Sequence, residues 1–428
     1  MKKKVIALLA AVSLLAGQTG CGIVRDEGAQ YLSKEDAQTE LSALLKKVDV
    51  TEVTNPAMYI YEDEISEADM LADIDTFPIM VEGNGQINLE IAAATEMSAD
   101  SPDDWLNVVA KNFNNEKMKV GDKSVSVSVR KITSGEAVTY INSGGYRPQM
   151  FIPSNFAWGE MLSASGVGID KIEDRIAGNT AGILIKKDVY ETFTSKYGDV
   201  TVKNVLEASN AGDIKFAYTN PYTSSTGLNI LTAMLKAFDE SDPLSETATG
   251  KLLEYQKTSP PVAYTTAVLR NQAAKGVINA MVMEKQAYVN TPELKNYVYV
   301  PAGIRHDHPV YTFEWDSEEE KQAAKLFTDY CLNEKSQKLA TDKGFNQDED
   351  YKAQDTGMNG ADYLAAQKVW KQNKNGGKPI IAVFVADVSG SMDGEPLNNL
   401  KESLIKTTSF ISSDHYVGLV SYSNEVTV

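Results

Sequence analysis

The sequence predicts an α/β protein with a two-lobed module and a doubly wound domain that begins near the C-terminus. Strand and helix patterns alternate along residues 76–345, as is typical of α/β folds. That region is longer than the usual domain of about 100–150 residues, so we expect two lobes. A continuous apolar run from Ile380 to Ala386, followed by an amphipathic helix pattern, predicts a parallel-sheet strand buried on both faces.

Strands in the central region are recognised by apolar or alternating runs between turn residues. They are expected at 86–93, 124–130, 149–152, 181–185, 216–220, 277–282 and 297–301. One helix is expected from Ser101, an N-cap serine followed by a proline, and another from Ser224. A third is expected from Glu318 to Leu339.

Two polar turns in this region are candidate ligand sites. The strand at 149–152 ends at a turn that contains Ser154 and Asn155, and one helix opens with Ser224, Ser225 and Thr226. Hydroxyls beside the free backbone N–H groups of a helix start suit an anion or a polar ligand. The same hydroxyls would also serve as simple helix caps, so the residues alone leave both interpretations open.

This order of elements resembles the extracellular solute-binding proteins of the two-lobed periplasmic type. The resemblance rests on the Ser154–Asn155 turn, the loop from Ser224 to Thr226, and the late helix at 318–339. It implies that a small polar or anionic solute binds in a cleft between the lobes, at the two polar turns.

A compact oxygen-rich motif follows the apolar strand near the C-terminus. Asp387, Ser389 and Ser391 are spaced two residues apart, and Gly390 allows a tight turn between the serines. Ligands in open α/β sheets bind outside the carboxyl ends of strands. One carboxylate and two hydroxyls suit Mg²⁺ or Mn²⁺. A serine-rich turn without a metal is the alternative.

The stretch from Ile380 to Met392 resembles the first strand and metal-ion-dependent adhesion site of a von Willebrand factor A domain. The resemblance implies a Rossmann-like, doubly wound fold. It also implies that Mg²⁺ or Mn²⁺ at Asp387, Ser389 and Ser391 is completed by an acidic side chain of a protein or surface partner. In this family, a threonine and an aspartate from later loops complete the metal site, and the positions of those loops are not in this sequence. We therefore expect residues 379–428 to be the first part of the domain, with one apolar sheet face open to water.

The N-terminus carries targeting signals. Three lysines precede an apolar run from Val5 to Ala16, which is shorter than the ~20 residues of a membrane span and fits a signal peptide. Thr19 and Gly20 before Cys21 resemble a bacterial lipobox. This implies a lipid anchor on Cys21 and a location on the extracytoplasmic face of the cell membrane. Ordinary secretion and an uncleaved N-terminal anchor are the alternatives.

Several other features have plain interpretations. The net charge of −18 argues against nucleic-acid binding, which needs a basic surface. Cys331 lies in a helical pattern and is expected to be a buried free thiol. His306 and His308 flank an aspartate and could offer zinc ligands, but Pro309 favours a surface turn. No catalytic constellation is identifiable, so a hydrolase is disfavoured.

The sequence therefore predicts a non-enzymatic surface lipoprotein. Its main predicted function is metal-dependent binding of a partner through residues 379–428, and the alternative is a solute receptor of a membrane transport system. The predicted organisation is a signal peptide at 1–21, an acidic stalk at 22–75, the two-lobed module at 76–345, and a linker at 346–378 before the final domain. The linker contains a short helix at 361–372, with Leu364 and Trp370 as candidates for docking.

Overall fold

The computed structural model describes Thr39 and residues 71–276, 278–374, 381–409, 416–423 and 426–427. The predicted signal peptide, the lipidation site Cys21 and the predicted stalk up to residue 70 lie outside the described residues, Thr39 apart. The described residues from 71 onward belong to one unit, residues 65–428. In the described part, none of the helices combines the length and the apolar character that crossing a membrane requires.

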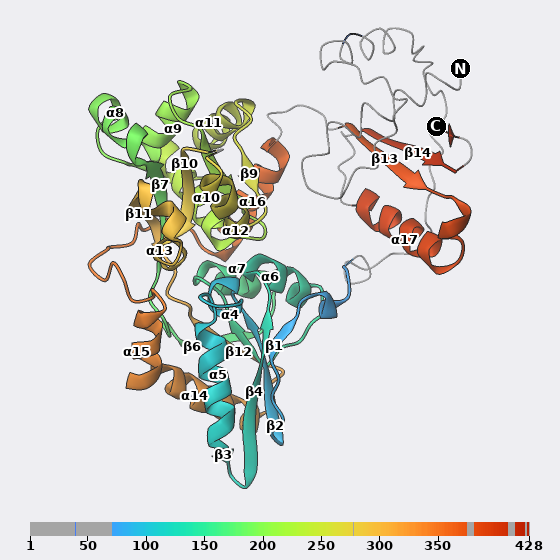
Figure 1. Cartoon of the computed structure of the whole chain (residues 1–428). Helices are drawn as coiled ribbons and strands as arrows, with labels where there is room; N and C mark the ends of the chain where they lie inside the picture. The colour runs from blue at the N-terminus through green and yellow to red at the C-terminus, as the bar shows by residue number, and fades with distance from the viewer. Residues whose placement is uncertain are drawn as a thin grey trace, which may run out of the picture. The chain divides into compact units, whose positions relative to one another are not determined.

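The first lobe is built on a mixed sheet with the strand order β1-β4-β2-β5-β12-β6 (Figure 1). Strand β2 runs parallel to β4 and β5, whereas β12 is antiparallel to β5 and β6. The strands are β1 (Ile79–Val81), β2 (Ile87–Ala93), β4 (Lys123–Lys131), β5 (Met150–Ile152), β6 (Ile169–Glu173) and β12 (Val310–Phe313), with β3 (Lys119–Val120) paired to β4. The central strands β2 and β4 bury apolar side chains in alternation, which anchors the sheet in its core.

Helices pack on this sheet and enclose two apolar cores. One core is shared with α5 (Trp105–Glu116), α14 (Glu318–Leu332) and α15 (Glu334–Asp342). The other is shared with α6 (Ser134–Asn142) and α7 (Ala157–Ala164). The one-turn helix α4 (Thr95–Ser98) follows β2 directly, and the short helix η1 (Ile74–Thr76) precedes β1.

The second lobe has a five-stranded sheet with the order β11-β7-β10-β8-β9. Its strands are β7 (Thr180–Lys186), β8 (Phe216–Thr219), β9 (Val262–Ala263), β10 (Ala280–Glu284) and β11 (Tyr297–Arg305). Its helices are α8 (Lys187–Tyr197), α9 (Val202–Asn210), α10 (Ser225–Phe238), α11 (Glu246–Lys257), α12 (Thr266–Ala274), α13 (Lys285–Val289) and η2 (Pro292–Asn296). Strand β10 is fully buried between β7 and β8, so it forms the centre of the lobe.

The α/β prediction is confirmed, and the described residues within 76–345 form two separate sheets, as two lobes would. The chain crosses between them after β6 and again after β11. The helix predicted from Ser101 is wrong at its start, because α5 begins at Trp105 and the preceding turn directs Asp103 toward Arg270 of the second lobe. The long helix predicted at 318–339 is two helices, because Asn333 ends α14 and caps α15.

The structure corrects the linker prediction for its first part. Helix α16 (Gly360–Asn373) packs against α7 of the first lobe and against α10 and α11 of the second. Tyr363 is buried in a core of the first lobe, and Trp370 is buried in the core of the second. The Trp370 indole donates to the Tyr218 hydroxyl at 2.9 Å. These contacts make α16 part of the module. Of the two docking candidates, Trp370 is buried in a core and Leu364 is partly buried against the other.

The C-terminal segment contains the predicted order of strand, helix and strand. Strand β13 (Ile381–Asp387) runs parallel to β14 (Tyr416–Tyr422), which pairs antiparallel with β15 (Val426–Thr427). Helices η3 (Gly390–Met392) and α17 (Glu395–Ser409) lie between the first two strands in the chain. The prediction that β13 is buried on both faces is wrong here, because Ile381, Val383 and Val385 are 71%, 57% and 65% exposed. This is the open apolar face that the sequence also led us to expect.

Candidate functional site

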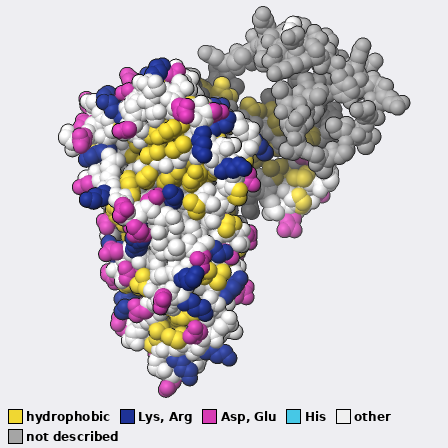
Figure 2. Space-filling view, turned by 60° about the vertical axis from the view of Figure 1, so that its left-hand side comes forward, with side chains coloured by type: hydrophobic (Ala, Val, Ile, Leu, Met, Phe, Trp, Pro, Cys, Tyr) yellow, Lys and Arg dark blue, Asp and Glu magenta, His cyan; other side chains and the backbone are white. Residues whose placement is uncertain are grey.

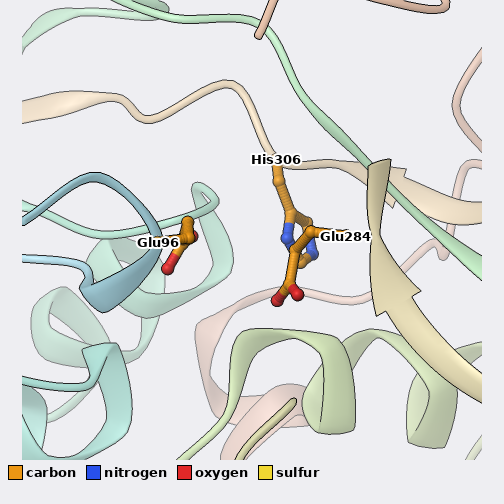
Figure 3. Close-up of side chains that lie close together, drawn as sticks. All are labelled: Glu96, Glu284 and His306. Carbon is orange, nitrogen blue, oxygen red and sulfur yellow. The ribbon is translucent and has the colours of Figure 1, made fainter. Parts of the chain in front are cut away.

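Three ionisable side chains meet where the two lobes join. Glu96 comes from α4 of the first lobe, Glu284 from the end of β10 in the second, and His306 from the segment that crosses between them. Their potential ligand atoms all lie within 4.8 Å of one another. Figure 3 shows the three side chains approaching one space from three different segments. The fold therefore builds this cluster from parts of the chain that are far apart in sequence.

His308 holds Glu96 in position. Its Nδ1 lies 2.8 Å from the Ala177 carbonyl oxygen, and its Nε2 lies 3.1 Å from Glu96 Oε1. The Ala177 carbonyl oxygen can only accept, so Nδ1 donates to it and Nε2 faces the Glu96 carboxyl group. Burial acts to raise the pKa of Glu96, but the hydrogen bond and charge of His308 outweigh it and lower the pKa to about 2. Glu96 and His308 are therefore bonded to each other beside the cluster.

The start of α10 supplies the second side of the site. Thr226 donates its hydroxyl hydrogen to Glu284 Oε1, and Ser225 Oγ accepts from the Trp158 indole of the first lobe at 2.8 Å. Ser224 accepts from the Gly227 N–H and so caps the helix. The sequence left open whether the hydroxyls of this loop bind a ligand or cap the helix. Ser224 caps the helix, whereas Thr226 lies at the buried cluster.

The other predicted turn lies at the same place. The Ser154 hydroxyl helps lower the pKa of Glu96 by hydrogen bonding, and the Ser154 carbonyl accepts from the His308 N–H at 3.1 Å. Asn155 Oδ1 accepts from the Ala157 N–H at 3.2 Å, which begins α7. Four of the five predicted ligand residues therefore surround the junction of the lobes, with the cap Ser224 adjoining them.

Buried polar atoms without hydrogen-bond partners gather around this junction. Leaving one such atom unpaired costs about 1–3 kcal/mol, and native proteins contain few of them. Among the described residues, those at or next to the cluster are both ring nitrogens of His306, Oε2 of Glu284, Nδ2 of Asn155, Oε1 of Gln286 and Nδ2 of Asn179. This concentration indicates a place where a bound group completes the hydrogen bonding or coordination.

Burial also sets the charge of the cluster. Burial first, and then the charge of Glu96, raises the pKa of Glu284 to about 7. Burial lowers the pKa of His306 to about 4, so its imidazole is neutral at physiological pH. Glu96 is bonded to His308, whereas among the described residues no basic side chain is bonded to Glu284. On the face in Figure 2, acidic and basic side chains are interspersed, so no large acidic field covers that face.

Direct contacts between the lobes surround the site. Arg270 of α12 forms an ion pair with Asp103 at 3.3 Å, and Gln286 Nε2 donates to the same carboxylate at 2.7 Å. The Gly135 N–H donates to the Thr223 carbonyl at 3.2 Å. These bonds join the turns of one lobe to those of the other, so a change at the site is coupled to how the lobes meet.

Sequence reasoning missed the charged part of this site. The prediction that His306 and His308 lie on a surface turn is wrong, because both residues are fully buried. Pro309 suggested exposure, but the segment runs between the lobes. Glu96 and Glu284 were also missed, although they lie within three residues of the ends of the strands predicted at 86–93 and 277–282. Their location at carboxyl ends of strands was the available signal.

The predicted metal residues of the C-terminal segment also lie together. Asp387 ends β13, and its Oδ1 accepts from the Ser389 N–H at 2.9 Å. The hydroxyls of Ser389 and Ser391 are 3.1 Å apart. The backbone hydrogen bond from Ser389 is the main reason that the pKa of Asp387 is lowered. Three oxygen-bearing side chains therefore occupy the turn after a parallel strand.

Comparisons with known proteins identify the module. Residues 94–346 match the model of the family described as bacterial extracellular solute-binding protein. Solved structures to which this chain is similar include a periplasmic thiamin binding protein, at 15% identity and a TM-score of 0.49, covering 69% of this chain and 99% of that one. They also include iron-bound HitA from Pseudomonas aeruginosa, at 14% identity and a TM-score of 0.49, covering 68% of this chain and 100% of that one. No curated protein matches the chain.

Proposed function

This chain belongs to the bacterial extracellular solute-binding proteins, and on that premise we propose that its module is the solute receptor of a membrane transport system. This role was the alternative interpretation of the sequence, and the family match favours it over metal-dependent adhesion as the main function. The observation that supports it best is the gathering of unpartnered buried polar atoms at the junction of the lobes. A binding role needs such a site and needs no catalytic group.

The charges of the site bear on the kind of solute. The sequence suggested a small polar or anionic solute, but the carboxyl groups of Glu96 and Glu284 both face the junction, and His308 is bonded to Glu96 and not to Glu284. An anion placed beside the Glu284 carboxylate in a buried site would be repelled strongly. We therefore propose that the solute is polar and presents a positive charge to Glu284.

A thermal-shift screen of polar and cationic solutes tests this function. A solute at a hundredfold excess over its Kd should stabilise the module by about 2.7 kcal/mol. Replacing Thr226 with valine removes the hydroxyl that donates to Glu284, so it should weaken binding of the solute. Thr249→Val is the matched control, because that hydroxyl bonds only carbonyls of its own helix. A screen without any stabilising solute would contradict the proposal.

We also propose a second function for the C-terminal segment, because Asp387, Ser389 and Ser391 are gathered in one turn. There Mg²⁺ or Mn²⁺ would be held by these three side chains, and an acidic group of a protein or surface partner would fill an open coordination position. A lipid on Cys21 would present both functions at the extracytoplasmic face of the membrane.

Magnesium titration of the full chain tests this second function. The titration is done with Glu284→Gln as background, so that the junction between the lobes does not contribute to metal binding. Asp387→Ala in that background should abolish the Mg²⁺ signal in calorimetry, while Asp393→Ala, a nearby acidic residue outside the motif, should leave it unchanged. Equal Mg²⁺ affinity before and after Asp387→Ala would contradict the assignment.

A further inference from the structure

We propose that Glu96, Glu284 and His306 form a binding site for one divalent transition-metal ion, and that this ion is the solute of the module. The proposal rests on the solute-receptor function and narrows it to one class of solute. It concerns a site at the junction of the lobes that is separate from the serine-containing motif at Asp387.

The donor set fits this class of ion. Two carboxylates and one imidazole offer hard oxygen atoms together with a borderline nitrogen atom. Oxygen-only sites suit Ca²⁺ and Mg²⁺, whereas imidazole suits zinc, iron, nickel and copper. A mixed set of this kind is expected to prefer Mn²⁺, Fe²⁺ or Zn²⁺. The neighbouring hydroxyl of Thr226 and water can supply further oxygen ligands.

The geometry is close to what an ion requires. The ligand atoms lie within 4.8 Å of one another, and typical zinc bonds to nitrogen and oxygen are about 2.0–2.2 Å. Two ligands of one ion are then at most about 4.4 Å apart, so a small approach of the side chains suffices. Because Glu96 and Glu284 belong to different lobes, the ion would also tie the lobes together.

The two histidines provide an internal contrast. His308 is fully buried and both of its ring nitrogens have partners, so its function is to hold Glu96. His306 is equally buried, yet neither of its ring nitrogens has a partner. A histidine that served only the core would be expected to donate to a nearby acceptor. His306 therefore has a ring nitrogen available within 4.8 Å of carboxylate oxygens of Glu96 and Glu284, as a metal ligand requires.

A purely structural explanation accounts for the cluster less well. Buried ion pairs are retained when additional hydrogen bonds satisfy their remaining atoms. The pair of Glu96 and His308 meets this condition, but the second oxygen of Glu284 does not. An ion bound at this position would satisfy Glu284 and His306 together, which no described neighbouring side chain does.

Calorimetric titration with MnCl₂ and with ZnCl₂ tests the proposal on the full chain after chelator treatment. Asp387→Ala is the background, which removes the second candidate metal site. We expect one ion bound per chain. Glu284→Gln and, separately, His306→Gln should each raise the Kd by about 100-fold or more, because even changes behind metal ligands cost 10–100-fold. Glu160→Gln, at an exposed position of α7, is the matched control and should leave the Kd unchanged.

Circular dichroism establishes that each variant is folded, so that lost binding is not lost structure. Failure of the folded chain to bind Mn²⁺ and Zn²⁺ would overturn the metal assignment, as would affinities that Glu284→Gln and His306→Gln leave unchanged. If an organic cation from the thermal-shift screen then binds and Thr226→Val weakens it, the solute-receptor function stands without the metal. If neither metal nor organic solute binds, both proposals fail.

Discussion

The two-lobed module and the C-terminal segment place a carboxylate at the end of a strand in opposite surroundings. Glu284 ends β10, is 4% exposed, and has one oxygen without a partner. Asp387 ends β13, is partly exposed, and accepts a backbone N–H. Burial raises the pKa of Glu284, whereas hydrogen bonding lowers that of Asp387. The module therefore carries a buried site whose polar atoms lack partners, whereas the C-terminal carboxylate is partly exposed and accepts a backbone hydrogen bond.

The apolar strands of the two regions differ in the same way. Val127 of β4 is fully buried under helices, whereas Val385 of β13 is 65% exposed. Burying such a side chain is worth about 1.5–3 kcal/mol, so β4 contributes to stability in a way that one face of β13 does not. The comparison teaches that a similar apolar run can form a core or an open sheet face, depending on what covers it.

The largest effect on the free energy of unfolding is expected from α16, because this helix packs against both lobes of the module. Trp370→Ala removes a buried indole and its bond to Tyr218, and should destabilise the module by about 3–5 kcal/mol. Urea denaturation measures this loss. Lys368→Ala, on the exposed side of the same helix, should change stability by less than about 0.5 kcal/mol. A small effect of Trp370→Ala would mean that α16 is a linker after all.

Much of this architecture could be predicted from sequence because local patterns carry it. The strict alternation of residues 124–130 and the apolar strand at 181–185 were enough to predict β4 and β7. The site was harder, because Glu96, Glu284 and His306 are brought together only by packing between lobes. No local pattern reports that. The segment that contains α16 was assigned to a linker because of its polar composition, although Trp370 was a candidate for docking. One face of the helix, with Tyr363, Ala366 and Trp370, is buried.

The next largest effect tests whether contact between the lobes matters for the site. A Cβ at Gly135 would lie 1.8 Å from the Tyr222 carbonyl oxygen of the other lobe. Gly135→Ala should therefore push the lobes apart, and an overpacking cost of about 1–3 kcal/mol would weaken Mn²⁺ binding about 10- to 100-fold.

Gly250→Ala is the matched control, because an added Cβ there meets no atom within 4 Å. It should leave the Mn²⁺ affinity unchanged in the same titration. Unaltered affinity in Gly135→Ala would show that the site works without this approach of the lobes.

Asp316 is a buried carboxyl group outside the candidate site, so it shows the effect of burial on a pKa without a ligand site. Burial raises the pKa of Asp316 to about 6, against the bond that its Oδ2 accepts from the Phe313 N–H. The folded state thus binds this proton more tightly than the unfolded state does. The resulting stability is present below about pH 4 and is lost as pH rises through 6.

Asp316→Asn keeps the acceptor and removes the charge. After allowance for partial exposure, it should stabilise the module by about 1–2 kcal/mol at pH 7 and by little at pH 4. Denaturant midpoints at the two pH values measure the difference. An equal gain at both pH values would exclude the charge of Asp316 as the cause.

The smallest effect is expected on the open face of β13. Val385→Thr keeps the β-branched shape and adds a hydroxyl that water can solvate, so the free energy of unfolding should change by less than about 0.5 kcal/mol. The same change at Val127 buries the hydroxyl and should cost about 1–3 kcal/mol. Measured side by side by denaturation, the pair tests the comparison directly. A cost at Val385 equal to that at Val127 would mean that the face of β13 is covered in solution, by another copy of the chain or by another surface.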